Sequence, residues 1–289
     1  MRLLVTGAGG MLGLDVLRAG ERAGHELVGL AHAELDIADT AAVEKAFARV
    51  SPQAVLNCAA WTDVDGAQSH REQAYAVNAH GAGSLARAAA QAGVPMVHVS
   101  TDYVFDGEAF VDRSGAPRAY VESDPTGPRS VYGESKLAGE RQVLAASPRH
   151  VVARSSWLFG TDGPNFAATM LRLADEREAV QVVTDQVGCP TWTGHLAPAL
   201  LGLLERGVTG LVHLAGTGHV SWNGFAREIF RQAEVSCRVE DATSEQMARP
   251  APRPAWSALE SERDDVIPLP PWQDGLAGYL AARAGIVRS

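Results

Sequence analysis

Short apolar runs alternate, along the first half of the chain, with longer stretches whose apolar residues recur every three or four positions. The short runs predict β-strands and the longer stretches predict amphipathic helices. The expected strands are residues 3–6, 26–30, 54–57 and 96–100. The expected helices are residues 11–23, 40–50 and 73–92. Strands and helices that alternate at this spacing form a parallel sheet with helices on both faces, so we expect an α/β fold with a doubly wound sheet.

The alternation is weaker in the second half of the chain. Strands are expected at residues 150–154, 180–183 and 211–214, and helices at residues 166–177, 195–205, 222–233 and 272–282. The Arg-Pro segment at residues 249–254 is expected to be extended, because proline excludes the helical conformation for itself and disfavours it for the residue before it. We therefore expect a smaller C-terminal α/β lobe, with about residues 195–215 returning to the first sheet.

Residues 104–130 are rich in Gly, Pro, Asp and Arg and show neither helical nor strand periodicity. Loops longer than about 12–15 residues inside a compact domain are usually functional or disordered. This segment lies between an expected strand and a helix that is expected to begin near Val131. Open α/β sheets bind ligands at such junctions, so we interpret the segment as part of the rim of an active site.

The composition is typical of a globular protein, with 46% hydrophobic and 20% charged residues among 289. The formal net charge of −9 disfavours nucleic acids and anionic membranes as partners. Three distant cysteines, Cys58, Cys189 and Cys237, form no CxxC pair, which argues against a disulfide framework and a structural zinc site. Neither a run of about 18 apolar residues nor a signal-peptide pattern is recognised, so we expect a cytoplasmic protein.

A glycine-rich loop follows the first expected strand and opens the first expected helix. Its glycines, Gly7, Gly10 and Gly13, are spaced as GxxGxxG. Glycine permits the tight turn and a close approach to a pyrophosphate, and the helix N-terminus offers N–H groups to the phosphates. We therefore expect a dinucleotide site, and we divide the chain into an NAD(P)-binding Rossmann domain, residues 1–155, and a mainly substrate-binding lobe, residues 156–289.

The end of the second strand usually distinguishes NAD from NADP, because an acidic side chain there binds the 2′-hydroxyl of the ribose. Here the strand ends on Leu30, Ala31 and His32, and the first acid is Glu34. A protonated His32 would favour the 2′-phosphate of NADPH. The prediction is therefore NADPH, and NADH stays open.

Tyr132 and Lys136 are four residues apart at the start of an expected helix, so they share one helix face. A nearby ammonium group lowers the pKa of a tyrosine, which otherwise lies near about 10. Tyr132 can then donate a proton to a carbonyl oxygen while a hydride arrives at the carbon. Only two of the 25 basic residues are lysines, so the place of Lys136 one turn after a tyrosine is informative.

Thr101 stands at the carboxyl end of the strand expected at residues 96–100. Polar residues at that end of a parallel strand point into the cofactor crevice, and a hydroxyl can donate a hydrogen bond to a carbonyl or a developing alkoxide. Thr101, Tyr132 and Lys136 are therefore the candidate catalytic residues.

These motifs together resemble the extended short-chain dehydrogenase/reductases. Further segments are similar to the dTDP-4-dehydrorhamnose reductase family in particular, and the resemblance spans nearly the whole chain. Those segments are residues 35–37, 57–65, 100–107, 154–157, 185–191, 221–226 and the Arg-Pro segment through Arg253 and Ser257. The resemblance implies reduction of the 4-keto group of a dTDP-6-deoxy-L-hexulose to dTDP-L-rhamnose by NAD(P)H.

The resemblance also implies roles for individual residues. It assigns catalysis to Thr101, Tyr132 and Lys136. It places around the cofactor, with Asp36 and Ile37 near the adenine, the residues Gly7, Gly10, Met11, Leu12, Gly13, Asp36, Ile37, Ala59, Ala60, Thr62, Tyr132 and Lys136. It places around the sugar nucleotide the residues Thr101, Asp102, Tyr103, Trp157 and Arg253. The flat ring of Trp157 and the guanidinium fork of Arg253 suit a sugar nucleotide with a diphosphate.

Some points stay open at this stage. The family pattern has Arg where His32 stands, which leaves the cofactor preference undecided. Some relatives bind a divalent ion at a dimer contact; no ligand cluster in this sequence demands a metal, so no metal residues are predicted, and Mg²⁺ and a homodimer are left open. Three other functions remain: a reductase of another dTDP-deoxysugar, a non-catalytic regulatory subunit of the methionine adenosyltransferase type, and an epimerase that retains NAD.

Overall fold

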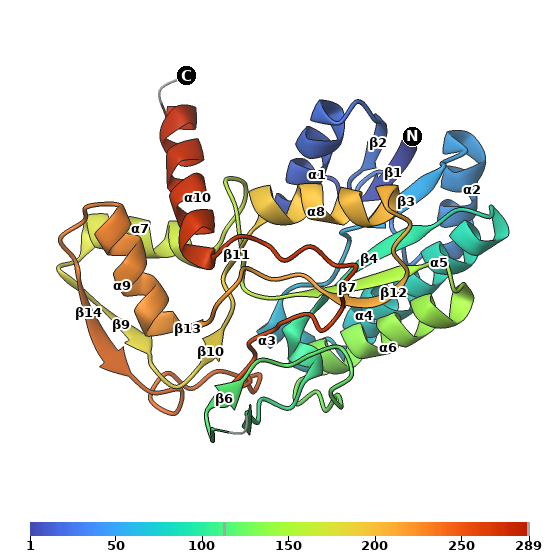
Figure 1. Cartoon of the computed structure of the whole chain (residues 1–289). Helices are drawn as coiled ribbons and strands as arrows, with labels where there is room; N and C mark the ends of the chain where they lie inside the picture. The colour runs from blue at the N-terminus through green and yellow to red at the C-terminus, as the bar shows by residue number, and fades with distance from the viewer. Residues whose placement is uncertain (112–113, 288–289) are drawn as a thin grey trace.

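The computed structural model describes residues 1–111 and 114–287, and a six-stranded parallel sheet forms its centre (Figure 1). The strand order is β12-β7-β4-β3-β1-β2, and each neighbouring pair is parallel. The strands are β1 (Arg2–Thr6), β2 (Glu26–Leu30), β3 (Ala54–Asn57), β4 (Met96–Thr101), β7 (Val151–Ser155) and β12 (Gly210–His213). The predicted α/β fold with a doubly wound parallel sheet is confirmed.

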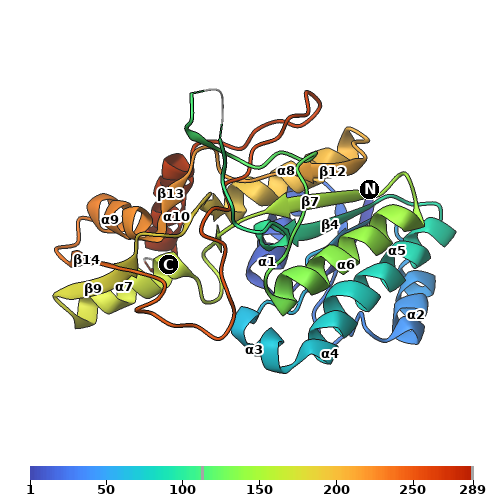
Figure 2. The ribbon, with the colours of Figure 1, turned by 90° about the horizontal axis from the view of Figure 1, so that it is seen from below.

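Helices cover both faces of this sheet (Figures 1 and 2). One face carries α1 (Met11–Arg22) and α8 (Thr193–Glu205), and the other carries α2 (Thr40–Val50), α5 (Ala82–Gln91) and α6 (Val131–Ala146). Successive side chains of a strand point to opposite faces. Leu3 and Val5 of β1 are therefore buried in the core beneath α1 and α8, whereas Leu4 is buried in the core beneath α2 and α5.

A smaller lobe lies beside the sheet and has its own apolar core around Phe225, Trp272 and Tyr279 (Figure 1). A parallel pair of strands, β9 and β14, forms its sheet. Its elements are α7 (Phe166–Glu176), β9 (Ala179–Val183), α9 (Trp222–Gln232), β14 (Arg238–Ala242) and α10 (Trp272–Val287). Between these elements the chain runs through α8, which packs on α1, and β12, which pairs with β7.

Four strands of two residues each lie outside these two sheets and pair with one another. They are β8 (Leu158–Phe159), β10 (Val187–Gly188), β11 (Thr191–Trp192) and β13 (Val220–Ser221). None of the described helices is long and apolar enough to cross a membrane.

The long helix expected over residues 73–92 is present, but part of it is not α-helical. The structure has α3 (Val64–Ser69), α4 (Arg71–Tyr75) and a π-helical turn, η1 (Ala76–Gly81), before α5 begins. Such a turn makes room for one extra residue, and π-turns often occur at functional sites. Asn78 lies in it and bonds to the backbone of Trp61, a long-range contact that helical periodicity cannot reveal.

The segment over residues 104–130 is more ordered than its composition predicted. It contains a small hairpin of β5 (Phe110–Val111) and β6 (Pro117–Arg118), and residues 112–113 lie outside the described part. Tyr120 is buried, stacks on Phe105 with ring centroids 4.0 Å apart, and donates its N–H to the carbonyl oxygen of Ala258 at 2.8 Å. The segment is thus tied to the C-terminal part of the chain.

Helix α6 is attached to β7 by a buried ion pair. Arg154 donates from Nε and Nη2 to the two carboxylate oxygens of Glu140 at 2.9 and 2.7 Å, and Ser100 on β4 donates to the same carboxylate at 2.6 Å. The Arg154 guanidinium also lies over the ring of Phe105. Because the partners satisfy each other's charge, the pair fixes α6 relative to β4 and β7.

Arg154→Ala should lower the free energy of unfolding by about 3–5 kcal/mol, because it leaves Glu140 as an uncompensated buried charge. Denaturant titration followed by circular dichroism measures the change. The control is Arg172→Ala, which breaks the exposed Arg172–Glu176 pair on α7 and should cost no more than about 0.5 kcal/mol. Equal losses in the two variants would show that the buried pair has no special part in holding α6.

Candidate active site

The glycine loop lies at the switch point of the sheet, where the chain goes from β1 to β2 on one side and β3 lies on the other. Gly7 has a φ of +69°, and a Cβ on it would come within 2.5 Å of the backbone nitrogen of Ala59. A Cβ on Gly13 would collide with the carbonyl oxygen of Gly7. These glycines therefore allow the loop, the start of α1 and the segment after β3 to approach one another closely.

The loop has the features of a diphosphate site. Gly10 is the N-cap of α1, and its lack of a side chain leaves the first N–H groups of the helix, at Met11 and Leu12, uncapped. Those groups and the partial positive charge of the helix end favour phosphate oxygens. We call the glycine loop together with the uncapped start of α1 the cradle. Its close turn, which Gly7 and Gly13 allow, fits the predicted dinucleotide.

The remaining residues predicted around the cofactor lie along the same edge of the sheet. Ala59 and Ala60 follow β3 and are half-buried, and Thr62 beyond them is exposed. Asp36 is exposed and accepts the N–H of Ala38, whereas Ile37 is buried against Gly81 of η1. Ile37 thus offers little side-chain surface, and Asp36 keeps a carboxylate at the surface.

Four of the predicted catalytic and substrate residues gather at the carboxyl end of β4. Thr101 ends the strand, and Asp102 and Tyr103 begin the 3₁₀ turn η2 (Asp102–Val104). The ring of Tyr132, at the start of α6, meets the ring of Tyr103 edge-on with centroids 5.6 Å apart. The Thr101 hydroxyl faces the phenol of Tyr132 and favours its phenolate by hydrogen bonding. The sequence prediction that these residues share one site agrees with this placement.

The pKa of Tyr132 differs from the prediction, although the phenol is protonated in both cases. Burial raises the pKa of its phenol to about 12, the Thr101 hydroxyl offsets this in part, and the nearby Asp102 carboxylate adds to the increase. The expectation that Lys136 lowers this pKa was wrong for this structure. The reason is that desolvation of a buried phenolate outweighs the other influences, and that the Lys136 amine is bound elsewhere.

Lys136 is buried under α6 and points toward β4. Its Nζ donates to the carbonyl oxygen of Val99 at 2.8 Å and lies 3.3 Å from Nε2 of His98. Burial lowers the pKa of Lys136 to about 8, although Glu140 and Cys58 favour its charged form. The amine therefore lies one helical turn from Tyr132, as predicted, but its hydrogen bonds go to β4.

Asp102 is buried and carries an unused acceptor. Thr101 donates to its Oδ1 at 3.0 Å, and within residues 1–111 and 114–287 its buried Oδ2 has no hydrogen-bond partner. Burial raises the pKa of Asp102 to about 6, and Ser257 and Thr101 offset this in part by favouring the carboxylate. A buried acceptor without a donor is costly unless a bound molecule supplies one.

Trp157 follows β7 two residues after its end. It adopts a left-handed backbone conformation with φ of +47°, which is costly for a residue other than glycine and often marks a functional position. Its ring stacks on Trp222 with centroids 3.5 Å apart, and a Cβ on Gly188 would collide with it. One face of the ring is therefore already covered.

Arg253 is near the cluster, but its guanidinium is already paired. Its Nη1 and Nη2 donate to the two carboxylate oxygens of Asp65 at 3.0 and 2.9 Å. Asp65 also accepts the N–H of Ala251 at 3.0 Å and lies 3.5 Å from Arg249. Hydrogen bonding from Arg253 lowers the pKa of Asp65 to about 2. The fork predicted for a diphosphate thus binds a carboxylate of α3 here.

Comparisons with known proteins agree with this geometry. The family model described as the RmlD substrate binding domain matches residues 1–284. A dTDP-4-dehydrorhamnose reductase of Mycobacterium tuberculosis (strain CDC 1551 / Oshkosh) is 47% identical over 290 residues, covering 98% of this chain and 93% of the relative. The chain belongs to the dTDP-4-dehydrorhamnose reductase family. The resemblance found in the sequence is thereby confirmed.

Two further proteins extend the comparison. The dTDP-4-dehydrorhamnose reductase of Bacillus anthracis str. Ames, solved in complex with NADP, has a TM-score of 0.92 at 33% identity and covers 97% of this chain and 99% of its own. A Streptomyces antibioticus protein named a probable dTDP-4,6-dihydroxy-2-methyloxan-3-one 4-ketoreductase is 39% identical over 284 residues, covering 96% and 93%. The expected Rossmann fold and membership of an NAD(P)-dependent oxidoreductase family are confirmed.

Sequence reasoning missed several residues that hold the site of this family member together. Asn78 in η1 accepts the N–H of Trp61, and its amide group donates to Ser135 on α6. Asn57 and His98 connect β3 and β4 to Lys136. The signal that could have found them is polarity: Asn57 ends the apolar run of β3, and His98 stands between two valines in β4.

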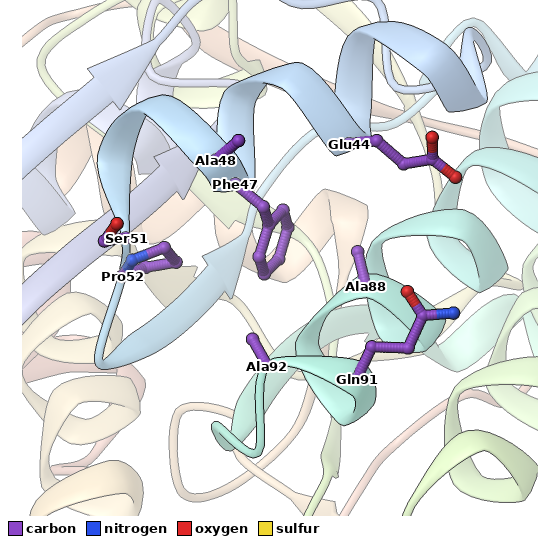
Figure 3. Close-up of a pocket in the computed structure, with 8 residues that line it drawn as sticks. All are labelled: Glu44, Phe47, Ala48, Ser51, Pro52, Ala88, Gln91 and Ala92. Carbon is purple, nitrogen blue, oxygen red and sulfur yellow. The ribbon is translucent and has the colours of Figure 1, made fainter.

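A pocket of about 460 Å³ between α2 and α5 lies away from this cluster (Figure 3). Phe47 and Pro52 line it from one side, and Ala88 and Ala92 line it from the other. These residues lie near the ends of helices that lead into β3 and β4, and hence at the amino-terminal edge of the sheet. The candidate active site described above is at the carboxyl edge of the sheet instead. Among the described residues no group of three or more His, Cys, Asp or Glu side chains could hold a metal ion.

Gly13→Ala should weaken NADPH binding at least about tenfold and lower stability by about 1–3 kcal/mol, because the added methyl group forces α1 away from the backbone of Gly7. Fluorescence titration with NADPH and thermal unfolding measure the two effects. Gly285→Ala in α10 is the matched control, because a Cβ there meets nothing within 4 Å. If Gly13→Ala binds NADPH as the wild type does, the proposed cradle is incorrect.

Proposed function

We propose that this chain reduces the 4-keto group of dTDP-4-dehydro-6-deoxy-L-mannose to dTDP-L-rhamnose with NAD(P)H. The observation that carries the proposal is the group of the buried Thr101 and Lys136 and the half-buried Tyr132, at the same edge of the sheet as the glycine loop. It supplies a proton donor at the edge of a sheet where a dinucleotide cradle is also present. Membership of a family whose relatives are named for this reaction supports the choice of sugar.

The cofactor residues are proposed on the same basis. The glycine loop, with Gly7, Gly10, Met11, Leu12 and Gly13, would hold the diphosphate. Asp36 and Ile37 would face the adenosine, and Ala59, Ala60, Thr62, Tyr132 and Lys136 would line the crevice toward the nicotinamide. When bound, the nicotinamide supplies the hydride for the carbonyl carbon.

Tyr132 is the proposed proton donor. Its raised pKa keeps the phenol protonated at neutral pH, which is the form that a reduction requires. A carbonyl oxygen that gains electron density becomes more basic than a phenolate, so the proton moves from Tyr132 to that oxygen. The single proton of the Thr101 hydroxyl, which goes to Oδ1 of Asp102 in this structure, would turn to the same oxygen or to the phenolate that forms and stabilise the negative charge there.

The substrate residues are proposed from the two sides of the crevice. Asp102, through its unpartnered Oδ2, would accept a sugar hydroxyl, and Tyr103 would pack beside it. Trp157 would lie against the substrate on the opposite rim, and Arg253 would face the diphosphate. In this proposal residues 1–155 and about 195–215 form the cofactor domain, and the rest of residues 156–289 forms the substrate lobe.

The direct test is incubation of the purified chain with the keto-sugar nucleotide and each cofactor, followed by NMR identification of the product. Formation of dTDP-L-rhamnose supports the proposal. A second candidate is a reductase of another dTDP-deoxysugar, which the Streptomyces antibioticus relative favours. Comparison of kcat/KM over a panel of keto-sugar nucleotides decides between the two. Absence of hydride transfer to every sugar would leave a regulatory subunit, and an NAD retained through purification would indicate an epimerase.

Tyr132→Phe should reduce kcat about 10²–10⁴-fold, because the phenylalanine has no proton to donate. Stopped-flow measurement of NADPH oxidation gives the rate, and fluorescence titration should show nearly unchanged NADPH binding. The matched control is Tyr75→Phe, which removes a hydroxyl that donates to Glu134 at 3.3 Å on the neighbouring surface of α6 and should leave kcat nearly unchanged. Wild-type turnover by Tyr132→Phe would remove Tyr132 from the proposal.

The cofactor preference depends on two residues of opposite effect. His32 at the end of β2 favours NADPH. However, Glu34 accepts the N–H of Ala31 at 2.9 Å, so that its carboxylate lies at the end of β2, where Ala31 approaches Gly9 of the loop. A carboxylate in that place favours a free 2′-hydroxyl over a 2′-phosphate. The proposal therefore keeps NADPH as the expected cofactor and includes NADH.

Glu34→Gln should raise the ratio of kcat/KM for NADPH to that for NADH about fivefold, because one negative charge a few ångströms from the phosphate is worth about 1 kcal/mol in water. Steady-state kinetics with the two cofactors measure the ratio. Glu44→Gln on α2 removes an exposed carboxylate elsewhere and should leave the ratio unchanged. An unchanged ratio in Glu34→Gln would mean that this carboxylate does not face the cofactor.

A further inference from the structure

A chain of buried polar groups leads from the glycine loop to Lys136. Thr6 at the end of β1 donates its hydroxyl to Oδ1 of Asn57 at 2.7 Å, and Nδ2 of Asn57 lies 2.9 Å from Nδ1 of His98. Nε2 of His98, on the other side of the ring, lies 3.3 Å from Nζ of Lys136. Thr6, Asn57 and His98 are all completely buried, so water does not compete for these groups.

The direction of each hydrogen bond in this chain is fixed at one end by the backbone. The N–H of Ala59 can only donate, and it points at Oδ1 of Asn57 at 3.0 Å. The amide of Asn57 must therefore keep its oxygen toward Ala59 and its NH₂ group toward His98. Nδ1 of His98 consequently accepts. A neutral imidazole that accepts at Nδ1 carries its proton on Nε2.

We propose that Asn57 and His98 are positioning residues that point an N–H donor at Lys136 and thereby favour its neutral amine over its ammonium form. An ammonium group has three donors and no acceptor, so it would face the Nε2–H of His98 donor to donor. A neutral amine accepts from Nε2–H and still donates to the carbonyl oxygen of Val99 at 2.8 Å. Only the amine satisfies both contacts.

The ionisable groups around Lys136 favour the amine, without making it the main form at neutral pH. Burial lowers the pKa of His98 well below its usual value, so the ring is neutral, and burial lowers the pKa of Lys136 to about 8. Cys58, after β3, is half-buried, and desolvation raises the pKa of its thiol to about 12 and keeps it uncharged. Glu140 on α6 favours the ammonium, but Arg154 from β7 neutralises its carboxylate through the buried ion pair.

The protonation of Lys136 would then be coupled to catalysis. A neutral amine cannot stabilise the phenolate that Tyr132 becomes after giving up its proton, whereas an ammonium can. Because the amine gains its proton as the pH falls, activity should decrease as the pH rises through the Lys136 midpoint. This consequence rests on the proposed function; the protonation state itself does not, and it can be measured without substrate.

The composition of the chain allows a direct measurement. The only lysines are Lys45, which is exposed, and Lys136, so lysine labelled with ¹³C at Cε gives two signals, of which Lys45 is the internal reference. Long-range ¹H–¹⁵N spectra report which ring nitrogen of His98 carries the proton, and the His98 signals are assigned by their loss in His98→Gln. We expect the proton on Nε2 and a Lys136 midpoint well below that of Lys45. A proton on Nδ1, or a midpoint no lower than that of Lys45, would overturn the proposal.

Asn57→Asp tests the cause. The aspartate would still accept from Thr6 and Ala59, but its second oxygen would now demand a proton on Nδ1 of His98, which leaves Nε2 as an acceptor for an ammonium. We expect the His98 proton to move to Nδ1 and the Lys136 midpoint to rise. The charge-matched control is Asn78→Asp, which adds a carboxylate on η1 without a contact to His98 and should leave the proton on Nε2. If the His98 proton stays on Nε2 in both variants, the role of Asn57 is refuted. The wild-type spectra report the protonation of Lys136 even if a variant fails to fold.

Discussion

The buried ion pair between Glu140 and Arg154 is the interaction on which the rest of the candidate site depends. Tyr132, Lys136 and Glu140 follow one another at intervals of four residues, so they lie on one face of α6. The pair attaches that face to β7, and Ser100 extends the attachment to β4. This attachment, one helical turn beyond Lys136, thus fixes the positions of the Lys136 amine and the Tyr132 phenol relative to the carboxyl end of β4.

Burial then decides the chemistry of the groups that α6 carries to this place. Four groups of the site have pKa shifts that favour their uncharged form: Tyr132, Lys136, Asp102 and Cys58. Desolvation is the largest cause of each shift. The same poor solvation that keeps these groups uncharged means that a new charge on a substrate oxygen is weakly screened. Such a charge interacts strongly with the nearest dipoles. The hydroxyls of Thr101 and Tyr132 are such dipoles. The site is therefore organised for charge that develops during a reaction rather than for charge held at rest.

The sequence predicted what depends on local pattern and failed where distant contacts decide. Alternating strands and helices predicted the parallel sheet, because apolar periodicity directly reflects burial. The π-helical turn was missed, and so was the contact of Asn78 within it to the backbone of Trp61, since helical periodicity contains no information on contacts between separate elements. Thr101, Tyr132 and Lys136 were predicted as a group from their spacing and motif. The direction of the Tyr132 pKa shift was not, because desolvation depends on how closely the surrounding elements pack, and spacing along one helix contains no information on that.

The pairing of Arg253 with Asp65 attaches the Arg-Pro segment to α3. Arg253 belongs to the extended Arg-Pro segment, and Asp65 belongs to α3 beside η1. Arg249 lies 3.5 Å from the same carboxylate, so two guanidinium groups share one acid and the segment keeps one positive charge. A chain with a net charge of −9 attracts anions only where such a local excess exists. Asp65 therefore does not cancel the cationic character of the segment; it orients the guanidinium of Arg253 and holds the segment against α3.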